Sequence, residues 1–327
     1  MKYLDQEKAI EQMDELAKLR KPFVFVISYD RKKVIVEALE DICPEELLFN
    51  FSGITNIPAD LSADISDIDW QFTSPSREAY HHSFQKVQDA ERAGDSFLVN
   101  LTCKTPLFTN QSLRDIFLRT SARYRLWIRD SLVCFSPEIF IRIENGTISS
   151  YPMKGTIDAT IPQAEKKLME DRKEAAEHAT IVDLIRNDLS MVADHVTVNR
   201  YRYVEKIATH RGAILQTSSE IIGQVLPYYR EHPGHLMMKL LPAGSITGAP
   251  KTKTMSIIQD AEGYDRGFYT GCMGIWKDGN IDSAVMIRFV DEEDGQLYYK
   301  AGGGITAMSD EESEYHEVIE KIYVPVC

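Results

Sequence analysis

Two pairs of glutamates have the residue type and spacing that most directly suggest chemistry in this sequence. Glu174 and Glu177 lie three residues apart in KEAAEH, and Glu314 and Glu317 have the same spacing in ESEYHEVIEK. Residues three apart share one face of an α-helix, so two such faces together would supply the hard oxygen ligands that Mg²⁺ prefers. Ordinary solvated faces remain the alternative, because acidic side chains are mostly exposed. Lys321, one turn beyond Glu317, could pair with that glutamate or hold a substrate carboxylate.

A lysine and a further glutamate could carry nucleophilic or acid-base chemistry. Lys154 lies in PMKGT, just after an Asn-Gly turn. A lysine in a semi-enclosed turn can lose its proton when it is desolvated, and it can then act as a nucleophile or base. Glu138 lies in SPEIF at the end of an apolar strand, where partial burial would raise its pKa and favour a general acid. For Lys154 the alternative is a solvated side chain, as most lysines in turns are.

The segment PAGSITGAPK (242–251) is rich in small residues and ends in a lysine. It does not match a phosphate-binding P-loop, because two residues separate Gly248 from Lys251, whereas in a P-loop the lysine directly follows the second glycine. Gly244 and Gly248 still permit a tight turn whose backbone N–H groups approach an anion. A purely structural turn is an equal alternative.

Two features of the C-terminal third could bind a carboxylate. Gly302, Gly303 and Gly304 follow an expected strand in YKAGGGIT, and their N–H groups could approach an anion without obstruction by side chains; a flexible loop is the alternative. Arg288 interrupts the apolar run VMIRFV, and a buried guanidinium needs an anionic partner. On the residues alone, a structural Asp or Glu is favoured over a ligand.

Hydrophobic periodicity predicts the elements that position these residues. The apolar stretch at 23–30 predicts a buried strand, and the charged stretch at 76–93 predicts a helix. Strands are expected on both sides of the Asn-Gly turn at 145–146. Apolar residues that recur at spacings of three, four and seven predict one long helix over 163–191, and a closing helix is expected over 311–321.

Composition limits the class of protein. The 327 residues are 43% hydrophobic, enough for a large core, and the formal net charge of −13 argues against nucleic acid or an anionic membrane as a partner. No apolar run approaches the ~20 residues that cross a bilayer, and the charged N-terminal sequence does not resemble a signal peptide, so we expect a cytoplasmic protein. The five cysteines are scattered without CxxC spacing, which gives no support to a zinc site or a disulfide framework.

Eight segments, taken in order, strongly resemble the chorismate-binding enzyme family. They are SPEIF (136–140), PMKGT (152–156), KEAAEHATIVDLIRNDL (173–189), PAGSITGAPK (242–251), RGFYTGCMG (266–274), DSAVMIR (282–288), AGGGI (301–305) and EYHEVIEK (314–321). The resemblance implies that family's α+β fold, an α/β sandwich of large, largely antiparallel β-sheets covered by helices. We expect a shortened N-terminal region at 1–70, packed on one continuous catalytic domain at 71–327.

The resemblance also implies roles for individual residues. Glu177 and Glu317 match the family's Mg²⁺ ligands, and Glu174 and Glu314 match the accompanying positions that act directly or through water. A second group matches positions that bind the substrate's carboxylates and enolpyruvyl group or that belong to the adjoining small-residue loop. Its members are Arg288, Tyr269, Gly302, Gly303, Gly304 and Lys321, with Ser245 and Thr247 in the loop.

Two positions separate the reactions of the family. A lysine in the PMKGT segment is typical of members that make 4-amino-4-deoxychorismate, a precursor of 4-aminobenzoate and folate, whereas members that make anthranilate generally carry alanine there. Lys154 would therefore attack C2 of chorismate while Glu138 protonates the departing C4 hydroxyl, and ammonia would then add at C4. Members that add water at C2 use a lysine at the position of Leu98, so water addition is disfavoured. The family's usual histidine is replaced by Gln216, and we do not regard His210 as catalytic.

The resemblance implies that ammonia comes from a separate glutamine amidotransferase subunit, because no glutaminase motif is visible in the chain. Two other activities remain open. The chain could make anthranilate, against which Lys154 counts, or it could be a non-catalytic regulatory subunit that binds chorismate. A binding module has no need of both a nucleophile and an acid, so the presence of Lys154 and Glu138 counts against this second alternative.

Overall fold

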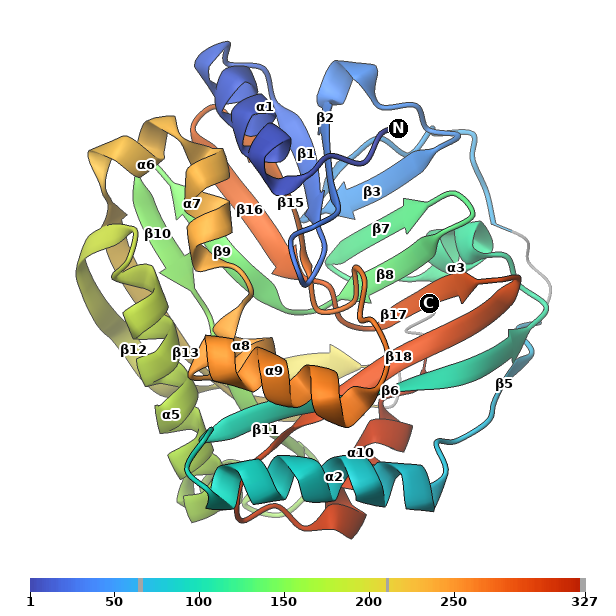
Figure 1. Ribbon diagram of the computed structural model, residues 1–327, viewed down its shortest axis with the longest axis vertical. Helices are drawn as coiled ribbons and strands as arrows, with labels where there is room; N and C mark the ends of the chain where they lie inside the picture. Colours follow the sequence, from blue (N-terminus) through green and yellow to red (C-terminus); the bar gives the residue numbers. More distant parts are fainter. Residues whose placement is uncertain (64–66, 210–211, 324–327) are drawn as a thin grey trace.

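The structure is a computed structural model that describes residues 1–63, 67–209 and 212–323, and these residues form two nine-stranded antiparallel sheets packed face to face (Figure 1). The first sheet has the strand order β11-β13-β10-β9-β16-β15-β1-β2, with β12 also paired to β13. Its strands are β1 (Phe23–Ile27), β2 (Val34–Ala38), β9 (Ile139–Glu144), β10 (Thr147–Ser150), β11 (Met153–Asp158), β12 (Ala193–Thr209), β13 (Gly212–Val225), β15 (Cys272–Lys277) and β16 (Asn280–Val285).

The second sheet has the order β14-β6-β18-β17-β8-β7-β3-β4, with β5 paired to β6. Its strands are β3 (Leu47–Phe51), β4 (Ile54–Thr55), β5 (Trp70–Phe72), β6 (Leu98–Thr109), β7 (Tyr124–Ile128), β8 (Leu132–Ser136), β14 (Gly248–Ala249), β17 (Phe289–Glu293) and β18 (Gln296–Ile305). The first 70 residues thus contribute strands to both sheets.

Helices cover the outer faces of both sheets (Figure 1). They are α1 (Gln6–Lys18), α2 (Arg77–Arg92), α3 (Leu113–Arg119), α4 (Ala164–Glu170), α5 (Arg172–Leu189), α6 (Pro227–Glu231), α7 (Pro233–Leu240), α8 (Gly244–Thr247), α9 (Lys251–Glu262) and α10 (Glu311–Glu320), with a 3₁₀ turn at Leu39–Asp41. The expected α+β architecture of antiparallel sheets covered by helices is confirmed.

Burial on two faces explains the continuous apolar run of β1. Phe23, Phe25 and Ile27 pack under the helices, whereas Val24 and Val26 point into the layer between the two sheets, and all five are fully buried. Successive side chains of a strand point to opposite faces, so a strand in the middle of such a sandwich must be apolar at every position. The strand expected at 23–30 therefore forms, although it ends at Ile27.

The long helix expected over 163–191 is wrong in one respect, because it is two helices. Asp171 takes an extended conformation (φ −66°, ψ 112°) and caps α5 by accepting a hydrogen bond from the backbone N–H of Glu174. An aspartate that binds a backbone N–H in this way begins a new helix and does not continue the old one. The capping residue, three positions before Glu174, therefore fixes where α5 starts.

A buried ion pair holds α9 to the second sheet. Arg266 and Glu262 have side chains only 2% and 1% exposed, and Glu262 also accepts hydrogen bonds from the backbone N–H and the hydroxyl of Thr102. We expect Glu262→Gln to lower the free energy of unfolding by about 3–5 kcal/mol, because it leaves a buried guanidinium uncompensated. Urea unfolding measures this loss. The exposed Glu292→Gln serves as the control, and an equal loss in both variants would contradict the structural role of the pair.

Candidate active site

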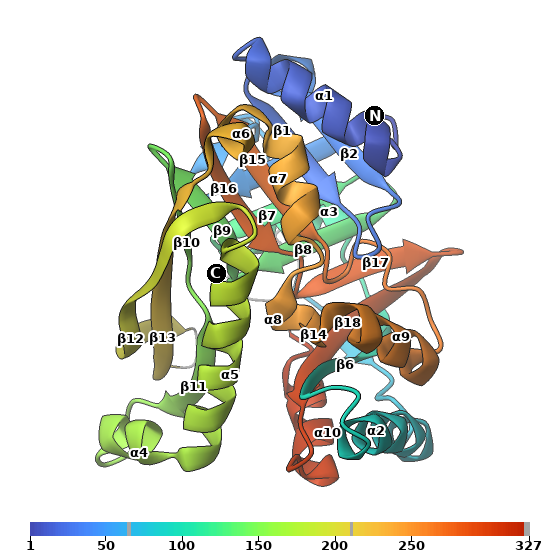
Figure 2. The ribbon, with the colours of Figure 1, turned by 60° about the vertical axis from the view of Figure 1, so that its left-hand side comes forward.

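Four elements from distant parts of the sequence meet at one place. Strand β11 carries Lys154, α5 carries Glu174 and Glu177, and α10 carries Glu314 and Glu317 beside the glycines of β18. Figure 2 shows α5 on the side of β11–β13 and α10 with α2 on the side of β6 and β18, so the two glutamate-bearing helices flank the space between the sheets.

Lys154 lies among the glutamates. Its Nζ is 2.6 Å from Glu177 Oε2, and it lies 4.0 Å from the point that a Cβ on Gly304 would occupy. A Cβ on Gly303 would lie 3.4 Å from Glu314 Oε2 and 3.6 Å from a carboxylate oxygen of Glu317. The structure thus brings together the lysine, the two acidic pairs and the glycine strand.

The surroundings of Lys154 correct one expectation. The lysine is not in a turn but on β11, at the edge of the first sheet, where the pairing with β13 shifts register between Lys154 and Thr156. Gly155 has a φ of 76° at this bulge, and a Cβ there would lie 3.1 Å from Glu174 Oε2. A β-bulge turns a side chain away from the regular sheet direction, and a glycine makes it possible here.

Burial and neighbouring ammonium groups set the charges of the site. Burial raises the pKa of Glu174 and of Glu314. Burial alone would also raise the pKa of Glu317, but the nearby ammonium of Lys321 lowers it. Burial alone would lower the pKa of Lys154, but the carboxylate of Glu177 outweighs it and raises that pKa.

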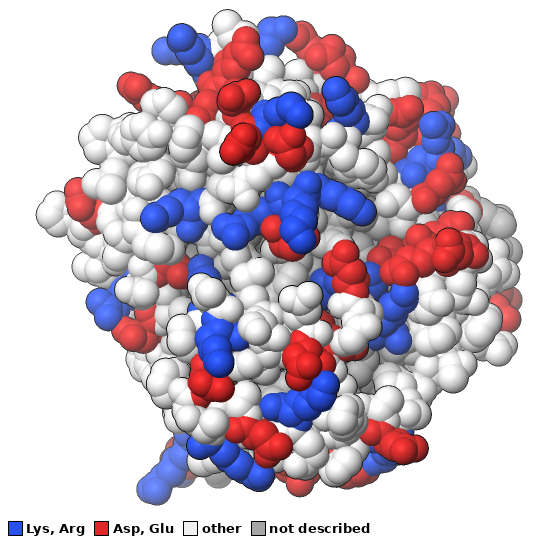
Figure 3. Space-filling model, viewed as in Figure 1, with Lys and Arg blue, Asp and Glu red and all other residues white. Residues whose placement is uncertain are grey.

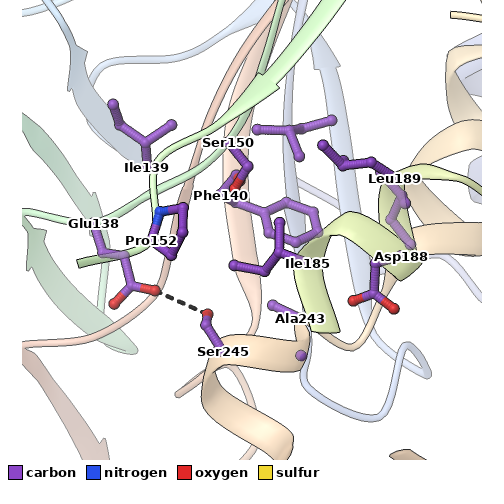
Figure 4. A pocket seen from close by; sticks show the side chains of 13 residues that line it. Glu138, Ile139, Phe140, Ser150, Pro152, Ile185, Asp188, Leu189, Ala243 and Ser245 are labelled. Carbon is purple, nitrogen blue, oxygen red and sulfur yellow. Dashed lines mark hydrogen bonds between the residues drawn. The ribbon is translucent and has the colours of Figure 1, made fainter. Parts of the chain in front are cut away.

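Glu138 lies directly before β9 and accepts a hydrogen bond of 2.9 Å from the hydroxyl of Ser245 (Figure 4). Burial raises the pKa of the Glu138 carboxyl, while the Ser245 hydroxyl and the positive charges of Arg288 and Lys321 act in the opposite direction. The two residues line a small cavity whose other walls are mainly apolar side chains of β9 and α5. Such surroundings favour a protonated carboxyl group, as a general acid requires.

The two cationic residues predicted to bind substrate differ in their contacts. Lys321 Nζ donates to the carbonyl oxygen of Gly302 at 2.8 Å and to Glu317 Oε1 at 2.6 Å. Arg288 lies just before β17 with a φ of 55°, and its guanidinium is 5.4 Å from the ring centre of Tyr323. No carboxylate of the described residues forms an ion pair with Arg288, so the structural acid that we favoured as its partner is not found in this part of the chain.

Two other sequence predictions are placed differently from expectation. Gly302 to Gly304 lie inside β18, paired with Thr102, Leu101 and Asn100 of β6, and do not follow the strand. The PAGSITGAPK segment forms the short helix α8 and the two-residue strand β14. A Cβ on Gly302 would lie 2.4 Å from the carbonyl oxygen of Leu101, so at least this glycine is needed for packing.

Several predicted side chains are already engaged within the protein or deeply buried. Thr247 is fully buried and its hydroxyl donates to the carbonyl oxygen of Ala243. Tyr269 is 2% exposed, and its ring centre lies 5.7 Å from that of Phe289. Gln216 is half-buried on β13, opposite Thr156, whereas His210 lies outside the described residues. The roles of Thr247 and Tyr269 in substrate binding stay predictions.

The chain matches a family model described as chorismate binding enzyme over residues 41–326. The chain belongs to the chorismate-binding enzyme family. Its members use chorismate, and the family predicted from eight sequence segments is thereby confirmed.

Individual members of the family differ in their sequence identity to this chain and in the share of each chain that the similarity covers. An uncharacterised PabA-like protein of Haemophilus influenzae is 44% identical over 320 residues, which is 97% of this chain and 96% of that protein. Aminodeoxychorismate synthase component 1 of Escherichia coli is 33% identical over 78% of this chain and 58% of its own length. Anthranilate synthase component 1 of Acetivibrio thermocellus is also 33% identical, over 75% of this chain and 52% of its own length. Identity therefore does not separate the two activities.

The fold agrees with the family. The crystal structure of a putative 2,3-dihydroxybenzoate-specific isochorismate synthase from Bacillus anthracis matches with a TM-score of 0.75 at 20% identity, over 98% of this chain and 89% of that one.

In the part of the chain that the structure describes, no helix combines the length and apolar character that crossing a membrane requires. Cys43, Cys103, Cys134 and Cys272 are free thiols, as expected; Cys327 lies outside the described residues.

The residues of this family member fit Mg²⁺ by their chemistry. Within residues 1–63, 67–209 and 212–323, no three His, Cys, Asp or Glu side chains are grouped closely enough to hold an ion. Mg²⁺ needs only one or two protein carboxylates, however, since it keeps several of its waters. Glu177 and Glu317 can supply these carboxylates, and Glu174 Oε2 is buried without a hydrogen-bond partner, so it remains available as an acceptor.

Sequence reasoning missed two charged residues near the site. Lys173 Nζ lies 3.8 Å from a carboxylate oxygen of Glu177 and 3.8 Å from one of Glu314. Its position four residues before Glu177 on one helix face was a usable signal.

Glu91, in the last turn of α2, is 7% exposed and neither of its carboxylate oxygens has a hydrogen-bond partner. Its surroundings come from tertiary packing, which helical spacing alone could not reveal.

The burial of Glu91 predicts a stability that depends on pH. Burial, with a smaller effect from Glu177, raises the pKa of Glu91 to about 8, so an energetic penalty on the folded protein grows as pH rises from the ordinary glutamate pKa of 4.5 to about 8 and is complete above it. Glu91→Leu removes the penalty, and we expect a gain of a few kcal/mol in the free energy of unfolding at pH 9. The gain shrinks as pH falls through 8 and disappears near the ordinary glutamate pKa of 4.5, where both states are protonated.

Urea unfolding at pH 5, 7 and 9 checks the Glu91 prediction, provided that the protein stays folded at all three pH values. Glu78→Leu on the exposed first turn of the same helix is the matched control, since it changes the charge without removing a buried carboxyl group. A gain for Glu91→Leu that is the same at all three pH values would show that the effect comes from packing and not from ionisation.

Proposed function

We propose that this chain is component I of an aminodeoxychorismate synthase, which converts chorismate and ammonia to 4-amino-4-deoxychorismate for the synthesis of 4-aminobenzoate. The observation that carries this proposal is the position of Lys154, with Nζ 2.6 Å from Glu177 and beside Gly304. A primary amine inside a cluster of carboxylates is placed to react with a substrate that a cation holds there. In the family, a lysine in this segment is typical of aminodeoxychorismate synthesis.

The environment of Leu98 supports the same choice of reaction. Leu98 is 4% exposed, and its Cδ1 lies 3.1 Å from the point that a Cβ on Gly304 would occupy. An apolar side chain therefore lies near Lys154, at the position where water-adding members of the family carry a second lysine. A leucine cannot take a proton from water, so addition of water at C2 has no base at this position.

In the proposed reaction, the neutral amine of Lys154 attacks C2 of the ring. Both ring double bonds shift, the C4–O bond breaks, and Glu138 donates a proton so that the hydroxyl leaves as water. Ammonia then attacks C4, both double bonds shift back, and Lys154 leaves as an amine. The enolpyruvyl group is retained throughout.

Protonation states decide whether these steps can occur. Glu138 must carry a proton to act as an acid, and burial raises its pKa accordingly. Lys154 must lose its proton to act as a nucleophile, but in this structure the carboxylate of Glu177 raises its pKa. When Glu177 binds another cation, burial becomes the larger influence on Lys154 and favours the neutral amine. Mg²⁺, bound by Glu177 and Glu317, would polarise the ring carboxylate.

The cationic groups around this centre suit a substrate with two carboxylates. Arg288 forms no ion pair with a described carboxylate, and its guanidinium can form two parallel hydrogen bonds with a carboxylate of the substrate. Lys321 is held by Gly302 and Glu317 at the same side of the site. The net charge of the chain is negative, yet Figure 3 shows that Lys and Arg side chains still gather in a band across the middle of the face seen there.

Ammonia at neutral pH is mostly ammonium, so the proposed reaction needs a source of free ammonia at the site. We propose a separate glutamine amidotransferase subunit as that source. A related protein bears the name aminodeoxychorismate synthase component 1, and a name of that form implies a second component.

Pyruvate release tests the proposed function against its nearest alternative. The purified chain is incubated with chorismate, Mg²⁺ and an ammonium salt, and both the loss of chorismate and the formation of pyruvate are followed. We expect chorismate to disappear without stoichiometric pyruvate, since the enolpyruvyl group is retained. Equal release of pyruvate and anthranilate would overturn the proposal, and binding of chorismate without turnover, even with a glutaminase present, would favour a regulatory subunit.

A further inference from the structure

Lys173 connects the two glutamate-bearing helices directly. It lies on α5, and its Nζ is 3.8 Å from Glu177 Oε1 on the same helix and 3.8 Å from Glu314 Oε1 on α10. The two carboxylates are only 8% and 7% exposed, whereas the lysine is 43% exposed. A half-exposed ammonium group therefore lies between two nearly buried acids that belong to opposite sides of the site.

The charges of the whole cluster explain why this lysine matters. Four glutamates would place four negative charges in a small volume, but three lysines lie against three of them. Lys154 pairs with Glu177, Lys173 lies between Glu177 and Glu314, and Lys321 pairs with Glu317. With all these groups ionised, the cluster has a net charge of about −1. Lysine ammonium groups thus lie next to the carboxylates that a divalent cation would need.

We propose that Lys173 competes with the divalent cation for Glu177 and Glu314, so that the cation and a dianionic substrate bind cooperatively. The inference rests on the proposed function for the identity of the cation and the substrate. A divalent cation alone must displace ammonium groups in a cluster already close to neutrality, whereas a substrate with two carboxylates supplies the missing negative charge. By linkage, each ligand must then raise the affinity for the other by the same factor.

Isothermal titration calorimetry with Mg²⁺ tests this proposal without any turnover. We expect Lys173→Met to bind Mg²⁺ alone about tenfold more tightly than the wild type, which corresponds to about 1.4 kcal/mol. Lys166→Met is the matched control, because Lys166 is an exposed helical lysine that pairs only with Glu170. Lys173→Arg retains the positive charge, and we expect it to stay close to the wild type.

The second arm repeats the Mg²⁺ titration in the presence of chorismate and the absence of ammonia. We expect chorismate to raise the Mg²⁺ affinity of the wild type about tenfold, and to raise that of Lys173→Met by a clearly smaller factor. Unchanged or weaker Mg²⁺ binding by folded Lys173→Met would overturn the proposal, as would equal coupling in both proteins. Circular dichroism melting curves establish that each variant is folded.

The outcome is separable from that of the proposed function. Mg²⁺ affinity and its coupling to chorismate do not depend on which product forms, so formation of anthranilate would overturn the function and leave the role of Lys173 standing. The reverse outcome is also informative. If the wild type forms 4-amino-4-deoxychorismate but Lys173→Met binds Mg²⁺ no more tightly than the wild type does, the proposed function stands and the proposed role of Lys173 is wrong.

Discussion

We expect Lys154→Met to lower kcat by about a thousandfold or more, while chorismate still binds. The proposed reaction begins with attack by this amine, and removal of the nucleophile from an enzyme that forms a covalent intermediate is among the most damaging substitutions known. The Lys154 amine also pairs with Glu177 at 2.6 Å, so the variant retains the acidic cluster but loses one positive charge. Steady-state kinetics with saturating ammonium measure the loss, and calorimetry measures chorismate binding.

Lys154→Arg separates the nucleophilic role of Lys154 from the effect of its positive charge. Arginine keeps a positive charge beside Glu177 but cannot supply a neutral amine, because its pKa is too high. We expect this variant to be as inactive as Lys154→Met. Substantial activity in Lys154→Arg would mean that the charge of the residue matters and that no covalent bond forms, which would contradict the proposed mechanism.

Glu138→Gln has the second largest expected effect, a loss of about 10²–10⁴-fold in kcat. The amide has the shape of the acid but cannot protonate the C4 hydroxyl as it leaves. The wild type is active when Glu138 is protonated, so its rate falls as pH rises through the pKa of this group, which burial raises. The pH profile of kcat measures both effects, and we expect the limb due to Glu138 to be missing from the residual rate of Glu138→Gln.

Ser245→Ala provides a finer test of the same assignment. The Ser245 hydroxyl donates to the Glu138 carboxylate at 2.9 Å and thereby lowers its pKa. Its removal takes a hydrogen bond from the charged form, so the pKa rises and the alkaline limb of the profile moves to higher pH. A shift to lower pH, or none, would contradict the identification of Glu138 as the group that gives this limb.

The sequence predicted the broad architecture because much of it follows from local patterns. The apolar run at 23–30 predicts a buried strand, which forms over Phe23–Ile27, and the Asn-Gly turn at 145–146 marks the hairpin between β9 and β10. The break at Asp171 was missed because helical periodicity continues across it. The capping hydrogen bond of Asp171 competes with continuation of the helix, and the spacing of apolar residues gives no sign of this competition.

The acidic pairs could be predicted as helical faces, but their convergence could not. Glu177 and Glu317 are 140 residues apart; α5 packs on β11 and β13 of the first sheet and α10 on β18 of the second, so their convergence depends on how the two sheets pack together. The position of Lys154 on a bulged strand likewise depends on pairing with β13. Local periodicity cannot predict that these residues lie close together in space. That expectation came from the resemblance to a family.

One local hydrogen bond and one contact between distant residues were also absent from the sequence prediction. Thr247 was expected in a small-residue loop beside the substrate, but its hydroxyl caps the carbonyl of Ala243 in the short helix α8. The spacing of Lys173 and Glu177 is visible in the sequence, but the contact of Lys173 with Glu314 depends on the relative position of α5 and α10. Side chains that bridge two helices are visible in the sequence only when both helices and their relative positions are already known.

Mass spectrometry of the product tests the central claim most directly. The wild-type chain is incubated with chorismate, Mg²⁺ and ¹⁵N-labelled ammonium, and the product is compared with chorismate by mass. The account predicts a compound in which one hydroxyl is replaced by a labelled amino group and the enolpyruvyl group is still present, with none formed by Lys154→Met. Labelled anthranilate, or the same product in undiminished yield from Lys154→Met, would contradict it.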